Sequence, residues 1–232
     1  MLTIQEIENI VLKRCPDNEC KNQFYIIGKN GIEYCKCHEK LLRYNRYNKA
    51  NIEVEWWDFE YEDLLEEFKK NKEILKIYNF FVNNIDLCIK NKVQFLFQGD
   101  IGLGKTTLAI LMLKSALDRG YGGLMLTGDG VIEKLYNGLK KDMDIIDFLV
   151  VDEYDRISRK STVIDFCNLM SSYIERKGII LLGNKSIQGL KNNGYDSFFI
   201  DRLNLLKKIE FKGESLRGKI KSKFETLIEE KK

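Results

Sequence analysis

Residues 98–108 read QGDIGLGKTTL and directly follow the apolar run VQFLF. From Gly99 the segment fits the pattern G-x4-G-K-[ST], whose glycines let the backbone curve around an anion and aim its N–H groups inward. A helix that begins near Lys105 adds the positive end of its dipole. We expect Lys105 to reach the β- and γ-phosphates of a nucleotide and the Thr106 hydroxyl to ligate Mg²⁺. The predicted nucleotide-binding residues are Gly99, Asp100, Ile101, Gly102, Leu103, Gly104, Lys105, Thr106 and Thr107.

From about residue 73 onward, strand-like and helix-like segments alternate along the chain. The apolar runs that we predict as strands are at 93–98, 123–127, 145–153 and 179–184. Helical patterns lie before and between them, at 72–90, 105–120, 129–139 and 161–178. Such alternation predicts an α/β fold with a parallel sheet flanked by helices. Ligands of these sheets bind beyond the carboxyl ends of the strands, where the glycine-rich loop lies.

Two carboxylates follow the third apolar run, in the segment FLVVDEYD. A buried strand that ends in acidic residues must direct them at positive charge, because unpaired buried charge is costly. We predict that Asp152 holds Mg²⁺ together with Thr106, and that Glu153 is the general base that polarises the attacking water. The alternative is an ordinary strand end that enters a solvated loop.

Asn184 ends the fourth apolar run, in the segment LLGNKS. One interpretation is that its side-chain amide orients the attacking water against the γ-phosphate. The other is that it is an ordinary turn residue or a helix N-cap. On the first interpretation Lys105, Glu153 and Asn184 act together in hydrolysis.

Four of the six cysteines lie in two pairs near the start of the chain, separated by the segment KNQFYIIGKNGIEY. This segment predicts a β-hairpin that turns at residues 29–31 and brings the two pairs together. Four thiolates suit tetrahedral Zn²⁺, and so small a domain needs a metal to fold. The predicted zinc ligands are Cys15, Cys20, Cys35 and Cys37. Two alternatives are that His38 replaces one cysteine and that all four are reduced core residues.

An amphipathic helix is predicted at the start of the chain. Thr3 and Glu6 form a capping box, the reciprocal hydrogen-bonding arrangement that begins many helices. The helical spacing places three apolar residues on one face: Ile4, Ile7 and Val11.

Composition divides the chain into three zones. Residues 1–50 form the cysteine-rich, zinc-binding domain, 51–72 an acidic and aromatic linker, and 73–232 the ATPase domain. The linker is either a hinge packed on the ATPase domain or a surface for a partner. Before it, Tyr44 and Tyr47 alternate with arginines, as in surfaces that stack on bases, or else belong to a solvated helix end.

The chain of 232 residues has a formal charge of +3, from 38 basic and 35 acidic residues. A charge this small does not by itself indicate a nucleic-acid binder. We find no secretory signal, and no uncharged apolar run approaches the roughly 18 residues that a membrane span needs. The cysteine usage indicates a reducing compartment, so we expect a cytoplasmic protein without a membrane partner. Cys88 and Cys167 fall in helical apolar patterns and are predicted core residues.

Six motifs occur in an order that is typical of one group of ATPases: GDIGLGKTTLA, LTGDGVIEKL, FLVVDEYD, LLGNKS, FFIDRLN and SLRGK. Between about residues 74 and 219 the chain resembles the AAA+ ATPases of the bacterial helicase-loader group (the DnaC/DnaI type), of which the transposition ATPase IstB is a relative. The resemblance implies a P-loop AAA+ fold of the ASCE type. It also implies that Arg202 acts in trans as an arginine finger and that Arg217 reads the γ-phosphate of ATP, from the same subunit or from its neighbour.

The same resemblance implies a function. It indicates a loader that uses ATP hydrolysis to ADP as a switch, self-associates through its ATP sites, binds a hexameric DnaB-type replicative helicase and assists its placement on single-stranded DNA. The main alternative is an IstB-like, transposition-associated DNA-binding ATPase. A P-loop kinase and a nucleotide-dependent binding module without hydrolysis are further alternatives.

The chain departs from the loader pattern at two places. Leu182, Gly183 and Asn184 stand where that group usually has Thr-Ser-Asn. After SLRGK only the segment IKSKFETLIEEKK follows, which is too short for a full helical lid and a helix-turn-helix DNA reader. We therefore do not expect an initiator of the same superfamily.

Overall fold

The computed structural model describes residues 1–13, 20, 24–28, 31–64, 71–137 and 145–216. It divides into two compact units, Met1–Phe59 and Glu60–Lys232. The boundary between the units lies inside the predicted linker, so that residues 51–59 belong to the first unit. In the described part of the chain, no helix combines the length and the apolar character that crossing a membrane requires.

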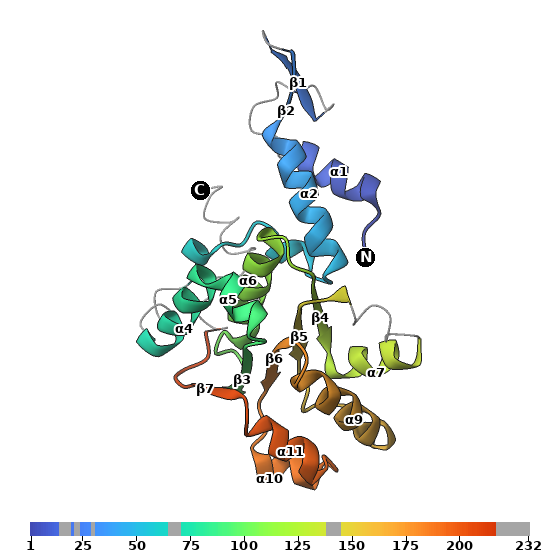
Figure 1. Cartoon of the computed structure of the whole chain (residues 1–232), viewed down its shortest axis with the longest axis vertical. Helices are drawn as coiled ribbons and strands as arrows, with labels where there is room; N and C mark the ends of the chain where they lie inside the picture. The colour runs from blue at the N-terminus through green and yellow to red at the C-terminus, as the bar shows by residue number, and fades with distance from the viewer. Residues whose placement is uncertain (14–19, 21–23, 29–30, 65–70, 138–144, 217–232) are drawn as a thin grey trace, which may run out of the picture. The chain divides into compact units, whose positions relative to one another are not determined.

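The first unit consists of two helices, a β-hairpin and a short 3-10 helix (Figure 1). Its elements in chain order are α1 (Ile4–Leu12), β1 (Tyr25–Gly28), β2 (Gly31–Tyr34), α2 (Lys36–Lys49) and η1 (Val54–Trp56). β1 and β2 pair antiparallel, with Gly28 opposite Gly31, which confirms the predicted hairpin. The capping box is confirmed too, because Thr3 Oγ1 accepts the Glu6 N–H and the Glu6 carboxylate accepts the Thr3 N–H.

Helix α1 buries a shorter stripe than its pattern predicts. Ile7 and Val11 are fully buried, whereas the side chain of Ile4 is 65% exposed. Ile4 lies on the same side of the helix as these two residues, as predicted from the spacing, but it is not buried with them. It is the first residue of α1, so it lies at the end of the buried stripe.

Aromatic side chains fill the core of the first unit. The ring centroids of Tyr44 and Trp57 are 4.8 Å apart, and the indole N–H of Trp57 donates to the carbonyl oxygen of Ile52 at 2.8 Å. Tyr47 is fully buried, and its hydroxyl accepts a hydrogen bond from Nε of Arg43. The interpretation of the two tyrosines as base-stacking rings is thus wrong, because neither ring face is open to a base. Trp57 belongs to this core and is neither a hinge contact nor a partner surface.

The second unit is built around a parallel sheet of five strands in the order β4-β5-β6-β3-β7. The strands are β3 (Gln94–Gly99), β4 (Gly123–Thr127), β5 (Phe148–Asp152), β6 (Gly178–Gly183) and β7 (Lys207–Phe211). The helices are η2 (Tyr61–Asp63), α4 (Lys72–Asn83), α5 (Ile85–Lys90), α6 (Lys105–Asp118), α7 (Gly128–Tyr136), η3 (Lys160–Thr162), α9 (Val163–Ile174), α10 (Ile187–Asn192) and α11 (Ser197–Leu203). The predicted α/β fold with a parallel sheet is confirmed.

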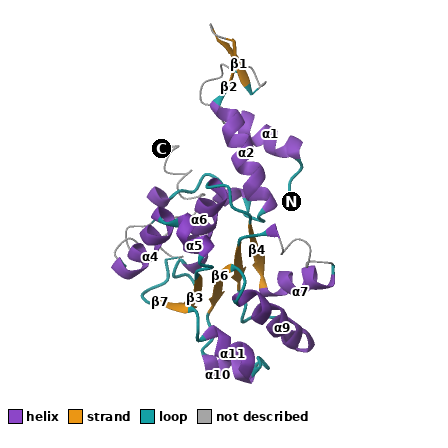
Figure 2. Cartoon of the chain, in the orientation of Figure 1, coloured by secondary structure: helices purple, strands orange, loops and turns teal. Residues whose placement is uncertain are grey.

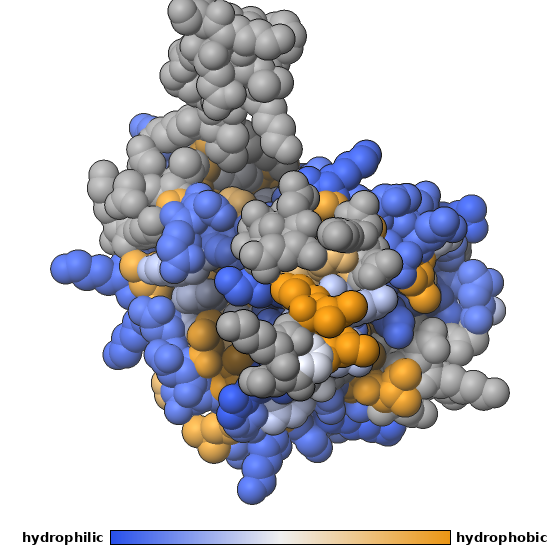
Figure 3. All heavy atoms as spheres, turned by 90° about the horizontal axis from the view of Figure 1, so that it is seen from above, coloured by the Kyte–Doolittle hydropathy of each residue, from blue (hydrophilic) through white to orange (hydrophobic). Residues whose placement is uncertain are grey.

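Helices cover both faces of this sheet (Figure 2). On one face, Phe81 of α4 packs on Phe148 of β5, with ring centroids 5.2 Å apart. On the other, the helices α7, α9 and α11 pack on the alternate strand residues Leu149 and Val151 in one apolar cluster. Cys88 and Cys167 are buried as predicted, and burial raises the pKa of the Cys167 thiol to about 11. On the face drawn in Figure 3 most described residues are hydrophilic, with a few hydrophobic areas near its centre.

Two elements differ from the sequence prediction. The predicted single helix over 72–90 is two helices, because Asn84 leaves the helical conformation and its side-chain amide donates to the carbonyl oxygen of Phe80. The fifth strand, β7, was not predicted. Its segment KKIEF is short and rich in charge, and only Ile209 and Phe211 are buried, as suits a strand at the edge of a sheet.

Gly99 joins β3 to the glycine-rich loop at a point where no side chain fits. Its φ is +147°, and a Cβ atom there would lie 2.3 Å from the carbonyl oxygen of Phe211 in β7. Gly120, after α6, also has a positive φ, of +98°, but nothing lies within 4 Å of its would-be Cβ. Substituting each of the two glycines therefore distinguishes the cost of backbone strain alone, at Gly120, from the cost of strain plus collision with β7, at Gly99.

We predict that Gly99→Ala lowers the free energy of unfolding by about 2 kcal/mol or more, because strain and collision with Phe211 add. Gly120→Ala is the matched control and should cost about 1 kcal/mol, from strain alone. Denaturant unfolding followed by circular dichroism measures both. Equal losses in the two variants would contradict the close approach of β7 to Gly99.

Candidate nucleotide site

The glycine-rich loop connects β3 to α6 at the carboxyl edge of the sheet. Gly102 and Gly104 have φ values of +84° and +83°, in the left-handed region that glycine adopts without strain. Leu103 between them is buried, whereas Ile101 is exposed. The backbone N–H of Leu216 donates to the carbonyl oxygen of Gly102 at 2.8 Å. The chain thus returns to this loop at its last described residue, and the predicted γ-phosphate reader, Arg217, lies outside the described residues.

Lys105, the first residue of α6, is buried beneath the loop. Its Nζ donates to the carbonyl oxygens of Gly99 and Asp100 and to Oδ1 of Asn184, each at 2.7 Å. These three bonds use all the donors of the ammonium group. Burial lowers the pKa of Lys105, and nearby carboxylates oppose this shift. Two predicted site residues 79 positions apart in the chain, Lys105 and Asn184, are therefore in direct contact.

The next residue of α6, Thr106, contacts Asp152 at the end of β5. The Thr106 hydroxyl donates to Oδ2 of Asp152 at 2.7 Å. Asp152 is the last residue of β5, as predicted, and its Oδ1 accepts the backbone N–H of Glu153. A hydroxyl and a carboxylate are oxygen donors of the kind that Mg²⁺ prefers. The pair therefore fits the predicted magnesium ligands, and Thr107 follows it in the first turn of α6.

Glu153 lies next to this pair but is held by an unpredicted partner. Its φ is +49°, a left-handed conformation that is rare for residues other than glycine. Its Oε1 accepts from Nη1 of Arg156 at 2.9 Å, and both side chains are partly exposed. Nothing in the sequence pattern predicts this ion pair, apart from the spacing of three residues.

Asn184 is not a helix N-cap. Ser186 caps the following helix, α10, by accepting the N–H of Gly189. The backbone N–H groups of Asn184 and Lys185 both donate to Oδ2 of Asp155, at 2.6 Å. Asp155 was not predicted as a site residue, because a third acid after the strand reads as part of a loop. The structure therefore leaves the side chain of Asn184 free of a capping role and places it on Lys105.

Arg202, the predicted arginine finger, lies on α11 and contacts other residues. Its Nη1 is hydrogen-bonded to the carboxylate of Glu175, and its guanidinium carbon lies 4.3 Å from the centroid of the Phe198 ring. Its Nε is buried and has no hydrogen-bond partner among the described residues. Within this chain, Arg202 is therefore engaged with α9 and α11 rather than with the glycine-rich loop.

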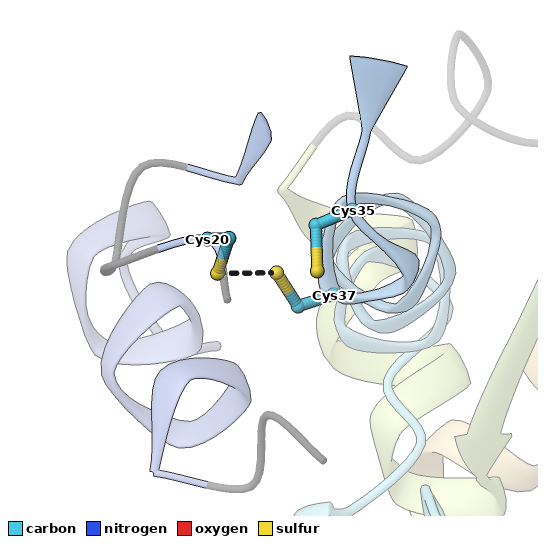
Figure 4. Close-up of side chains that lie close together, drawn as sticks. All are labelled: Cys20, Cys35 and Cys37. Carbon is cyan, nitrogen blue, oxygen red and sulfur yellow. Dashed lines mark hydrogen bonds between the residues drawn. The ribbon is translucent and has the colours of Figure 1, made fainter. Parts of the chain in front are cut away.

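Three of the predicted zinc ligands converge in the first unit (Figure 4). The sulfur atoms of Cys20, Cys35 and Cys37 lie within 4.8 Å of one another, and all three residues are buried. The Sγ atoms of Cys20 and Cys37 are 3.4 Å apart. Three buried thiols at such distances suit Zn²⁺, which takes four ligands. The fourth predicted ligand, Cys15, lies outside the described residues.

His38 stands apart from this cluster. Its ring is stacked on that of Tyr34, with centroids 4.2 Å apart, and it is not among the described groups that could hold a metal ion. The described geometry therefore favours cysteines over His38 as the metal ligands.

We predict that Cys37→Ser lowers the zinc content of the purified chain well below one ion per molecule, because a hydroxyl is a poor replacement for a thiolate. Both tryptophans lie in the first unit, so their emission reports on that unit alone. The emission should shift to the red in Cys37→Ser or after chelation of the wild type. Cys88→Ser, from the core of the second unit, is the control. Equal zinc contents in the two variants would contradict the site.

The parallel sheet, the glycine-rich loop and the composite site at its edge fit a P-loop AAA+ fold. No protein-family model matches it, and the comparison with curated proteins finds no significant match. Among solved structures, a DNA replication initiation factor matches with a TM-score of 0.54 and 20% identity, over 75% of this chain and 55% of that chain. The replication initiator DnaA, bound to AMPPCP and single-stranded DNA, matches with a TM-score of 0.51 and 22% identity, over 69% and 51%.

A Streptococcus pyogenes serotype M3 protein, described as a primosome component, matches with a TM-score of 0.53 and 14% identity, over 72% of this chain and 92% of that chain. The chain thus spans about half the length of the first two structures but most of the third. At these identities the likeness concerns the fold. It confirms the predicted P-loop AAA+ fold.

Proposed function

We propose that this chain is an ATP-hydrolysing helicase loader that binds a hexameric DnaB-type replicative helicase and assists its placement on single-stranded DNA. The observation that most supports this proposal is that Lys105, Asn184 and the Thr106–Asp152 pair meet at the carboxyl edge of an AAA+ sheet. Supporting it, proteins described as a replication initiator and a primosome component have the same fold. The nucleotide is ATP, and its hydrolysis is the switch.

Each residue of the site has a role in hydrolysis. Lys105 binds the β- and γ-phosphates, whose oxygens take the place of the carbonyl and amide acceptors that it now contacts. Thr106 and Asp152 hold Mg²⁺, which supplies positive charge against the phosphates. Glu153 leaves Arg156 to polarise the attacking water, and Asn184 orients that water.

Two arginines complete the site: Arg202 from a neighbouring copy of the chain, and Arg217 from the same copy or its neighbour. Arg202 supplies its guanidinium in trans once it is released from Glu175, and Arg217 reads the γ-phosphate. Phe198 and Leu205, both well exposed, lie beside Arg202 in sequence and suit a contact between copies. Self-association through the ATP sites then couples hydrolysis to assembly.

The first unit holds the helicase. We test this with light scattering on a sizing column, using the full chain mixed with the replicative helicase of its source organism, with and without ATP. A complex that forms with the wild type and weakens in Cys37→Ser supports the loader and gives the zinc unit its role. No complex under any condition would contradict it and favour the IstB-like alternative, for which strong binding to long duplex DNA is the expected sign.

We predict that Glu153→Gln binds ATP as the wild type does but lowers kcat at least about a hundredfold, because a general base is lost. Lys105→Ala should weaken ATP binding itself. Steady-state phosphate release and titration with a fluorescent ATP analogue measure the two effects. Glu133→Gln, on the exposed surface of α7, is the matched control. A fully active Glu153→Gln would remove Glu153 from the mechanism.

We predict that Arg202→Ala keeps ATP binding and lowers kcat about a hundredfold or more, as the loss of an arginine finger does. Because the site is shared, an equimolar mixture of Arg202→Ala and Glu153→Gln should regain activity. In that mixture some sites combine the intact Glu153 of one copy with the intact Arg202 of another. Normal hydrolysis by Arg202→Ala alone, or a mixture as inactive as its parts, would show that Arg202 does not act in trans.

A further inference from the structure

The turn after β5 fixes Asp155 at the end of the neighbouring strand β6. The backbone N–H of Tyr154 donates to the carbonyl oxygen of Leu182, which extends the pairing of the two strands by one step. The Tyr195 hydroxyl donates to the carbonyl oxygen of Tyr154 at 2.6 Å. The N–H of Arg156 closes the turn on Glu153. The backbone position of Asp155 is thus fixed by the hydrogen bonds of neighbouring residues, independently of its own side chain.

The side chain of Asp155 is a buried carboxylate, with 1% of the residue exposed. Its Oδ2 accepts two backbone N–H groups, of Asn184 and Lys185, both at 2.6 Å. Its Oδ1 is buried and has no hydrogen-bond partner among the described residues. A buried charge is costly unless hydrogen bonds or an opposite charge compensate it, so the two N–H groups are important to Asp155. Here it fixes the backbone of the residue whose side chain contacts Lys105.

Gly183 makes room for this arrangement. A Cβ atom at Gly183 would lie 2.6 Å from Cε1 of Tyr154 and 3.1 Å from Cγ of Asp155. A serine at this position, as in the usual loader pattern, would collide with both side chains. The glycine at 183 and the buried carboxylate therefore belong together, because a side chain at 183 would occupy the space that Tyr154 and Asp155 fill.

We propose that Asp155 is a positioning residue, which holds Asn184 in the orientation that ATP hydrolysis requires. The inference rests on the proposed ATPase activity. The carboxylate of Asp155 accepts two short, charge-assisted hydrogen bonds, and these set the direction that the chain takes after β6. The amide of Asn184 then points at Lys105 and at the site of the γ-phosphate. Asp155 acts through the backbone of Asn184, which its carboxylate holds.

The test measures kcat, KM and ATP-analogue affinity for Asp155→Ala, Asp155→Asn, Asn184→Ala and the double variant Asp155→Ala/Asn184→Ala. Asp155→Ala should lower kcat about tenfold or more with little change in affinity, because a displacement of about 1 Å is enough. In Asp155→Asn the amide oxygen still accepts both N–H groups, so kcat should stay within about threefold of the wild type. The double variant should match Asn184→Ala, since Asp155 acts through Asn184.

Several results would overturn the inference. They are a normal kcat in folded Asp155→Ala, effects of Asp155→Ala and Asn184→Ala that multiply in the double variant, and an Asp155→Asn as impaired as Asp155→Ala. If Asp155→Ala does not fold, Asp155→Ser takes its place, because its shorter side chain does not span both N–H groups. An inactive wild type would refute the proposed function instead, and the amide proton shifts of Asn184 and Lys185 in Asp155→Asn would still report on the two hydrogen bonds.

Discussion

The site depends on one buried ammonium group. Nζ of Lys105 is bonded to oxygens at the end of β3, in the loop and at the end of β6. Buried charge is tolerated only when its donors are used, so the backbone around Lys105 must present oxygens at these positions. The three bonds thereby tie two strands and the loop into one unit. The bonds also hold the ammonium group in a position where the oxygens of an anion can replace its present acceptors.

Three acidic residues lie near this ammonium group, and each binds a different partner. Asp152 accepts from the Thr106 hydroxyl, Asp155 accepts from the backbone that directly follows β6, and Glu153 between them forms the ion pair with Arg156. Because successive residues after a strand point in different directions, three acids within four residues reach three different partners. The turn that separates them requires the left-handed conformation of Glu153. The strained backbone is thus that of Glu153 itself, the residue proposed as general base.

The first unit is small, and its stability rests on two different kinds of contact. One is the packing of Trp57 against Tyr44 of helix α2. The other is the cysteine cluster at the start of the same helix, where Cys35 directly precedes the first helical residue and Cys37 lies in the first turn. A domain this small buries a smaller fraction of its surface than a larger one, so its stability from packing is marginal. A metal bound by the cluster would add the missing stabilisation.

Sequence patterns alone predict the parallel sheet, the hairpin, the glycine-rich loop and the meeting of Lys105, Thr106, Asp152 and Asn184 at one edge. These follow from local rules, because hydrophobic periodicity, turn residues and glycine spacing act over a few neighbouring residues. Which charges pair depends on the folded chain. The Arg202–Glu175 contact and the partners of Asp155 join segments that are far apart in the sequence, and the burial of Tyr44 and Tyr47 depends on the packing of the first unit. The Glu153–Arg156 ion pair is local, but it needs the left-handed turn at Glu153. A residue type does not specify its partner; the packing that brings two elements together does.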